Sequence, residues 1–96
     1  MGKQVKSIMQ QGDPRCYICG RVTELDLHHV MGGTANRSLS DKYGLVVWLC
    51  REHHTGNTGV HRNYDKSERL KRLAQIAFEA RHSHEEWMQI FRKNYL

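Results

Sequence analysis

The sequence predicts an α+β fold in which two short strands and several helices surround a metal-stapled core. Three observations lead to this prediction. A Cys-x2-Cys pair at residues 16–19 and a Cys-x2-His pair at residues 50–53 have the spacing of a closed zinc site. Two short apolar segments, 25–30 and 44–49, read as strands. The last third of the chain has the apolar spacing of helices.

The length and composition set the size of this core. The 96 residues fit one domain, of which only 39% are hydrophobic. We divide it into a lead-in over 1–14, a core over 15–62 and C-terminal helices over 65–95. A structural metal would compensate for the thin core, because small zinc modules gain roughly 10–16 kcal/mol of folding free energy from their ion.

Charge and cysteine content indicate the surroundings and the partner. Fifteen Lys and Arg against ten Asp and Glu give a net charge of +5, which favours nucleic acid as a partner. Three cysteines cannot all pair as disulfides, and no apolar run is long enough for a signal peptide or a membrane span. We therefore expect a cytoplasmic protein with reduced thiols and no membrane partner.

The first elements are a lead-in and a zinc knuckle. Val5, Ile8 and Met9 have helical spacing, so a short helix is one reading of the lead-in, and a turn follows at 12–14. Residues 15–20 read as the knuckle. Its closing glycine, Gly20, allows the tight backbone path that points both sulfurs at one ion.

Residues 25–30 are predicted to form the first strand. Its alternation sends Asp26 and His28 to one face and Leu27 and His29 to the other. Residues 31–42 are polar and glycine-containing, and we expect them to form a long loop, a kind of segment that is often functional. The second strand, 44–49, is strongly apolar and runs directly into the second ligand pair.

Helices are predicted after the second strand. A helical turn begins at 51–55, a glycine-bearing loop at 56–59 interrupts it, and His61 returns towards the site. Two capping boxes follow, Asp65 with Glu68 and Ser83 with Glu86, and each begins a helix. The expected inward residues are Leu70, Leu73, Ala74, Ala77 and Ala80 in the first helix and Trp87, Ile90 and Phe91 in the second.

The paired ligands define a candidate structural zinc site. Thiolates and imidazole are the ligands that zinc prefers in closed tetrahedral sites. We assign Cys16, Cys19, Cys50 and His53. His54 is a rival for the fourth position, but the two-residue spacing favours His53.

Four further histidines close to these motifs predict a second, open metal site. They are His28, His29, His54 and His61. Neutral imidazoles around an ion with open positions are typical of catalytic rather than structural sites. Because neighbouring strand residues face opposite ways, one of the adjacent pair could bind the ion while the other reaches a water or a phosphate.

The order of these motifs resembles a known family. Cys-x2-Cys, then His28-His29-Val30, then a strand ending in Leu49-Cys50-x2-His53-His54, is similar to the HNH endonucleases with the ββα-metal fold. The similarity covers about residues 16–61. The runs His28 to Gly33, Ser40 to Leu45 and Gly59 to His61, with the ending Phe91-x-Lys93-Asn94-Tyr95-Leu96, also resemble small HNH-type proteins of bacteriophages and prophages.

The resemblance implies roles for the histidines. His28 matches a metal ligand and His29 the general base, while His54 and, more loosely, His61 match the remaining metal ligands. The family cuts or nicks DNA, expected to be double-stranded, with one divalent ion, which would be Mg²⁺, Mn²⁺, Ni²⁺ or Zn²⁺. A neutral imidazole with a pKa of roughly 6.5 suits the base role.

The chain departs from the family pattern at two places. The family's middle Asn, which orients the base, is replaced by Lys42-Tyr43-Gly44, and Asn36 or Asp41 is the nearest substitute. His54 and His61 lie seven residues apart, so a loop rather than a helix has to bring them together. Asn57 or Thr58 is an alternative ligand.

The sequence therefore predicts a metal-dependent DNA endonuclease of phage or prophage type in a bacterial cytoplasm. Basic side chains placed near the core are the expected phosphate contacts, namely Arg37, Lys42, Arg51 and Arg62. The alternative is a non-catalytic zinc-stabilised module that binds nucleic acid or serves recombination or packaging.

Overall fold

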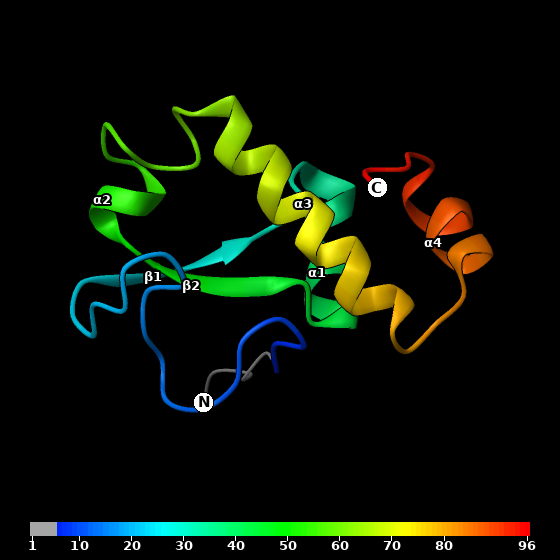
Figure 1. The fold of residues 1–96 in the computed structure, drawn as a ribbon, viewed down its shortest axis with the longest axis horizontal. Helices are drawn as coiled ribbons and strands as arrows, with labels where there is room; N and C mark the ends of the chain where they lie inside the picture. The colour runs from blue at the N-terminus through cyan, green and yellow to red at the C-terminus, as the bar shows by residue number, and fades with distance from the viewer. Residues whose placement is uncertain (1–5) are drawn as a thin grey trace.

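A computed structural model describes residues 6–96 as a two-stranded antiparallel sheet with helices (Figure 1). The elements are β1 (Leu25–His29), α1 (Thr34–Tyr43), β2 (Val46–Cys50), α2 (Arg51–His54), α3 (Tyr64–Glu79) and α4 (His84–Phe91). This confirms the α+β class. None of the helices within residues 6–96 is long and apolar enough to cross a bilayer.

The two strands pair in the register that places the first histidines. His28 lies opposite Val47 and Asp26 opposite Leu49, so these residues share one face of the sheet. Leu27 lies opposite Trp48 on the other face. Both predicted strands are present, although β2 begins at Val46 rather than at residue 44 and extends to Cys50.

The outer edge of β2 is covered by the N-terminal segment, residues 6–17. Main-chain and side-chain hydrogen bonds tie the segment to the strand, and this removes the exposed edge that a two-stranded sheet would otherwise present. They are Ile8 N to Gly44 O (2.9 Å), Ser7 Oγ to Val46 O (2.5 Å), Trp48 N to Gln10 Oε1 (2.8 Å) and Tyr17 N to Trp48 O (2.8 Å). Of the short helix suggested for the lead-in, Val5 lies outside the described residues, and residues 6–11 form no helix.

Helix α1 replaces the loop predicted for residues 31–42, so that prediction is wrong. Gly33 precedes the helix with a φ of 95°, and Gly44 ends it in the left-handed conformation with a φ of 72°. Ser40 is fully buried, and its hydroxyl accepts from Met31 N at 3.1 Å and donates to Met31 O at 3.0 Å. This side chain fixes the helix against the end of β1.

Helix α3 begins two residues earlier than the predicted capping box would place it. Asn63 precedes the helix and Asp65 lies inside its first turn, so Asp65 does not cap it. The inward stripe includes Leu70 and Ala74 as predicted and continues through the buried residues Gln75 and Phe78. Ala80, which was expected to face inward, is exposed beyond the end of the helix.

Helix α4 begins at the predicted capping box. Glu86 N donates to Ser83 Oγ and Ser83 N donates to Glu86 Oε1, both at 3.0 Å. Trp87 is fully buried, and its indole N–H donates to Lys93 O at 2.8 Å.

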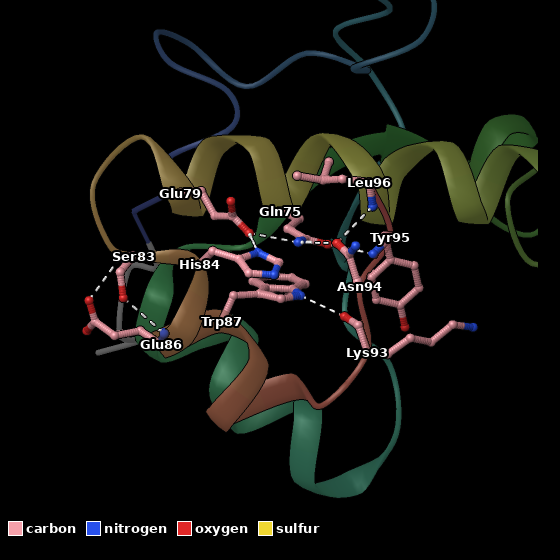
Figure 2. Close-up of polar contacts among 10 residues, drawn as sticks. All are labelled: Gln75, Glu79, Ser83, His84, Glu86, Trp87, Lys93, Asn94, Tyr95 and Leu96. Atoms are coloured by element: carbon pink, nitrogen blue, oxygen red, sulfur yellow. Dashed lines mark hydrogen bonds and ion pairs between the residues drawn. The ribbon is translucent and has the colours of Figure 1, made fainter.

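The C-terminal tail is tied to α3 through a single buried amide (Figure 2). Gln75 Nε2 donates to Asn94 Oδ1 at 2.8 Å, and Tyr95 N donates to Gln75 Oε1 at 2.7 Å. Gln75 Nε2 also donates to Glu79 Oε2 at 2.7 Å. The buried polar side chain is therefore fully paired, which is the condition for placing it in a core.

The core lies between the sheet and the helices and joins both ends of the chain. Its fully buried members come from the knuckle, the sheet and its flanking residues, α1, α3 and α4, and they are led by Trp87, Phe78, Met31, Leu45 and Leu49. In Figure 1, α2 lies at one end of the sheet, and α4 with the C-terminus lies at the other. The helices after residue 63 thus support the sheet but leave the α2 end free for the metal ligands.

Gly44→Ala should destabilise the protein by at least about 1–2 kcal/mol, because an L-residue pays that much for the left-handed conformation. A Cβ at Gly44 would also collide with Lys6 O and lie 3.1 Å from Ile8 N. Urea unfolding measures the change. Gly32→Ala is the control, since its Cβ would meet no atom within 4 Å. A Gly44→Ala variant as stable as this control would contradict the packing described.

Candidate metal centres

The knuckle is built by a glycine and two main-chain bonds. Gly20 has a φ of 82°, as its predicted role requires. Gly20 N donates to Cys16 O and Cys16 N donates to Arg21 O, both at 2.8 Å. This tight turn brings Cys16 and Cys19 onto the same side of the loop, next to the end of β2.

The four paired ligands lie close enough to hold a metal ion. The ligand atoms of Cys16, Cys19, Cys50 and His53 are all within 4.8 Å of one another. Cys19 Sγ lies 3.8 Å from Cys50 Sγ, and His53 Nδ1 lies 3.3 Å from Cys50 Sγ and 3.7 Å from Cys16 Sγ. Ligands on a tetrahedral zinc ion are separated by about 3.5–3.8 Å, given bonds of about 2.0–2.3 Å. The donor set and the separations therefore fit a structural metal.

The thiols of this cluster have altered acidity. Burial raises the pKa of Cys16, but N–H groups of Cys50, Cys19 and Ile18 outweigh burial and lower this pKa to about 6. At Cys19 the Arg21 N–H lowers the pKa, while desolvation and the sulfurs of Cys16 and Cys50 prevail and raise it. Crowded sulfurs resist carrying several negative charges, and a cation removes that repulsion.

The second cluster gathers three histidines from separate elements. His28 comes from β1, His54 from α2 and His61 from the loop after α2. Their ligand atoms lie within 4.8 Å of one another, and the Nε2 atoms of His54 and His61 are 3.0 Å apart. The adjacent residues His53 and His54 thus belong to different clusters. His53, rather than His54, is therefore the fourth potential ligand beside the three cysteines.

A folded-back loop places His61. Val60 N donates to His53 O at 2.9 Å and His61 N donates to His54 O at 3.2 Å, so the chain returns along α2. Gly59 makes this approach close, because a Cβ there would lie 2.6 Å from His54 O. The loop therefore brings His54 and His61 together, whereas a continuous helix would separate two residues seven positions apart by about 10 Å.

Asp26 orients His54, a role that the sequence reading did not assign. His54 Nδ1 lies 3.1 Å from Asp26 Oδ2, and a carboxylate can only accept, so Nδ1–H donates. The lone pair is then on Nε2, which faces His61. A carboxylate behind a metal-binding histidine is a common arrangement that fixes the ring and its tautomer. The predicted alternation, which places Asp26 on the face of His28, was the available signal.

Two of these imidazoles are held neutral. Burial, followed by the charges of His54 and His61, lowers the pKa of His28 to about 3. Burial and then His54 lower the pKa of His61. Near neutral pH both rings keep the lone pairs that a metal needs.

His29 lines the same small pocket as the three histidines. This pocket has a volume of about 280 Å³ and is lined by Leu27, His28, His29, Gly32, Gly33, Arg37, His54 and His61. His29 Nε2 lies 2.8 Å from Asp41 Oδ1. His29 faces the opposite side of β1 from His28. It is the last residue of the strand, and it lines the same pocket as His28.

The remaining predicted residues lie at different places. Arg37 lines the histidine pocket, whereas Lys42 lines a separate and larger pocket. Arg51 is exposed on α2, and Arg62 Nε donates to Thr55 O at 3.2 Å.

Three polar candidates also lie outside the described lining of the histidine pocket. Asn36 is half-buried on α1. Thr58 N and Oγ1 donate to Glu52 Oε2, at 3.0 and 2.7 Å, and Asn57 O accepts from Asn63 Nδ2 at 3.1 Å. Of the two substitutes considered for the family's Asn, Asp41 is therefore the one that contacts His29.

Comparisons with known proteins assign this chain to no family. A scan against family models found no match, and searches of curated proteins and of solved structures found no significant similarity.

Cys19→Ser should remove the metal of the first cluster and much of the stability. We expect a loss of at least several of the roughly 10–16 kcal/mol that such a site supplies. Cys19 is exposed, so its side chain contributes little packing of its own. Metal content and thermal unfolding measure the effect, with Val22→Ala in the same loop as the control. A variant that keeps its metal and melts like the wild type would rule out Cys19 as a ligand.

Gly59→Ala should separate the two clusters. The added Cβ would push residues 59–61 away from His54 O and move His61 out of the histidine cluster. We expect the protein to keep the first metal and to lose at least about tenfold in affinity for a second divalent ion. Titration calorimetry measures both. Equal affinity for the second ion in Gly59→Ala and Gly32→Ala would refute the role given to this loop.

Proposed function

We propose that this protein is a metal-dependent DNA endonuclease of the HNH type, with β1, β2 and α2 as a ββα-metal core. The observation that carries the proposal is the histidine pocket, where three converging imidazoles lie beside His29 and Arg37. A metal-ligand set, a base and a phosphate contact are the parts that phosphodiester hydrolysis needs.

His28, His54 and His61 would hold the catalytic ion, and Asp26 would keep Nε2 of His54 turned towards it. Three nitrogen ligands leave further coordination positions free for the substrate. A divalent ion bound there supplies Lewis-acid stabilisation of the charge that develops on the phosphate and on the leaving oxygen.

His29 is the general base in this proposal, and Asp41 is its positioning residue. Because Nε2 lies 2.8 Å from Asp41 Oδ1, the ring proton sits on Nε2 and the lone pair sits on Nδ1. Nδ1 can then take the proton of a water. Asp41 holds the ring and favours the imidazolium that forms, as a carboxylate does behind other catalytic histidines.

The reaction is a hydrolysis at phosphorus. His29 removes a proton from water, the water oxygen bonds to phosphorus, and the bond to the 3′ oxygen breaks. The 3′ oxygen takes a proton from solvent, so the products carry a 5′ phosphate and a 3′ hydroxyl. Arg37, which lines the same pocket, is placed to contact a phosphate oxygen through its guanidinium.

A zinc-stabilised nucleic-acid-binding module is the second candidate. It is favoured by the missing family Asn, since Lys42-Tyr43-Gly44 stands in that stretch and Asn36 lies outside the described lining of the pocket. Metal analysis separates the two candidates. A binder needs one ion per chain, whereas the enzyme needs a second, exchangeable one.

Supercoiled plasmid should be nicked by the protein with Mg²⁺, Mn²⁺ or Ni²⁺, and His29→Ala should lower the rate by about 10²–10⁴-fold, as expected for loss of a general base. Asp41→Asn should cost less, about tenfold, because the amide oxygen can still accept from Nε2–H of His29 but no longer stabilises the imidazolium by charge. His84→Ala, a histidine paired with Glu79 on the far helices, is the control. Equal nicking by His29→Ala and His84→Ala would sink the proposed mechanism.

A further inference from the structure

A larger pocket lies beside the sheet face that carries Leu27, Val46 and Trp48. It has a volume of about 620 Å³, within the range of small-molecule sites. Its walls are the N-terminal segment, the sheet face that carries Trp48, and the C-terminal end of α1. Arg81, from the turn after α3, completes the lining. The lining residues are Lys6, Ser7, Ile8, Gln10, Gln11, Gly12, Leu27, Lys42, Tyr43, Gly44, Val46, Trp48 and Arg81. Only Leu27 is shared with the histidine pocket.

The charge of this pocket is of one sign. Lys6, Lys42 and Arg81 converge on it from three separate segments. Among the described residues that line it, none carries a carboxylate. Cations gathered without a counter-charge repel one another, and an anionic ligand removes that repulsion.

Two aromatic side chains give the pocket apolar walls. Trp48 is the one residue of β2 that is not buried. Its backbone is fixed on both sides, because its N–H donates to Gln10 Oε1 at 2.8 Å and its carbonyl accepts from Tyr17 N at 2.8 Å. Tyr43 packs edge-on against Phe78, with ring centroids 5.4 Å apart. Fixed aromatic rings can stack on a planar group, and neighbouring cations can bind a phosphate attached to that group.

We propose that this pocket binds one nucleotide, with its base against Trp48 and Tyr43 and its phosphate between Lys42 and Arg81. The ligand can be a free mononucleotide or the end of a single DNA strand, since both offer the same chemistry. The site uses none of the histidines, so it stands independently of the nuclease proposal.

Calorimetry on the metal-loaded full chain tests the site with adenosine 5′-monophosphate as the probe. Adenosine and inorganic phosphate should each bind at least about tenfold more weakly, because each lacks half of the contacts. Binding of adenosine 5′-monophosphate should quench tryptophan fluorescence, since Trp48 lines the pocket and Trp87 is fully buried. A 5′-phosphorylated oligo(dA) identifies the source: tighter binding than the mononucleotide points to a strand end, and weaker binding points to a free nucleotide.

Variants decide whether binding occurs at this place. Lys42→Ala and Arg81→Ala remove exposed cations and should each weaken adenosine 5′-monophosphate binding about tenfold, with unchanged melting. Arg69→Ala on α3 is the matched control, and His61→Ala should bind the nucleotide like the wild type. The proposal is overturned by no binding at millimolar nucleotide, by equal binding of inorganic phosphate, or by Lys42→Ala and Arg81→Ala behaving like Arg69→Ala.

Discussion

Cys50 ends β2, and His53 and His54 lie in the single helical turn that follows, so one short backbone segment supplies ligands to both clusters. His53 Nδ1 turns towards the cysteines, whereas His54 Nε2 turns towards His61. Any movement of this turn changes both clusters together. An ion on the first cluster would fix the turn against the knuckle, and thereby fix the direction in which His54 points.

The second cluster depends on contacts that surround this turn. Asp26 holds His54 from β1, and the return of the chain through Gly59 holds His61 from the other side. His28 is buried by the same packing, which keeps its ring neutral. A small protein thus assembles a ligand set from three elements with few residues. The C-terminal helices contribute at a distance, through the core that supports β1 and β2.

The sequence predicted the features that rest on local spacing. The knuckle, the two strands, the choice of His53 and the capping box at Ser83 all follow from residues close together in the chain. Helix α1 was missed because Gly32-Gly33 before it and polar residues such as Asn36, Ser38 and Ser40 within it favour a loop locally. The tertiary contacts of Ser40 outweigh that preference. Ala35, Leu39 and Tyr43, spaced four apart, were the overlooked signal.

The contact between Asp41 and His29 could be weighed only once α1 was known, because its helical path brings residue 41 back to the end of β1. Both clusters depend on the turn after β2, which offers ligands to two ions. Anomalous diffraction from crystals grown with zinc measures this directly. We expect one peak among Cys16, Cys19, Cys50 and His53 and a second among His28, His54 and His61. A single peak, or one ligated by both His53 and His54, would contradict this expectation.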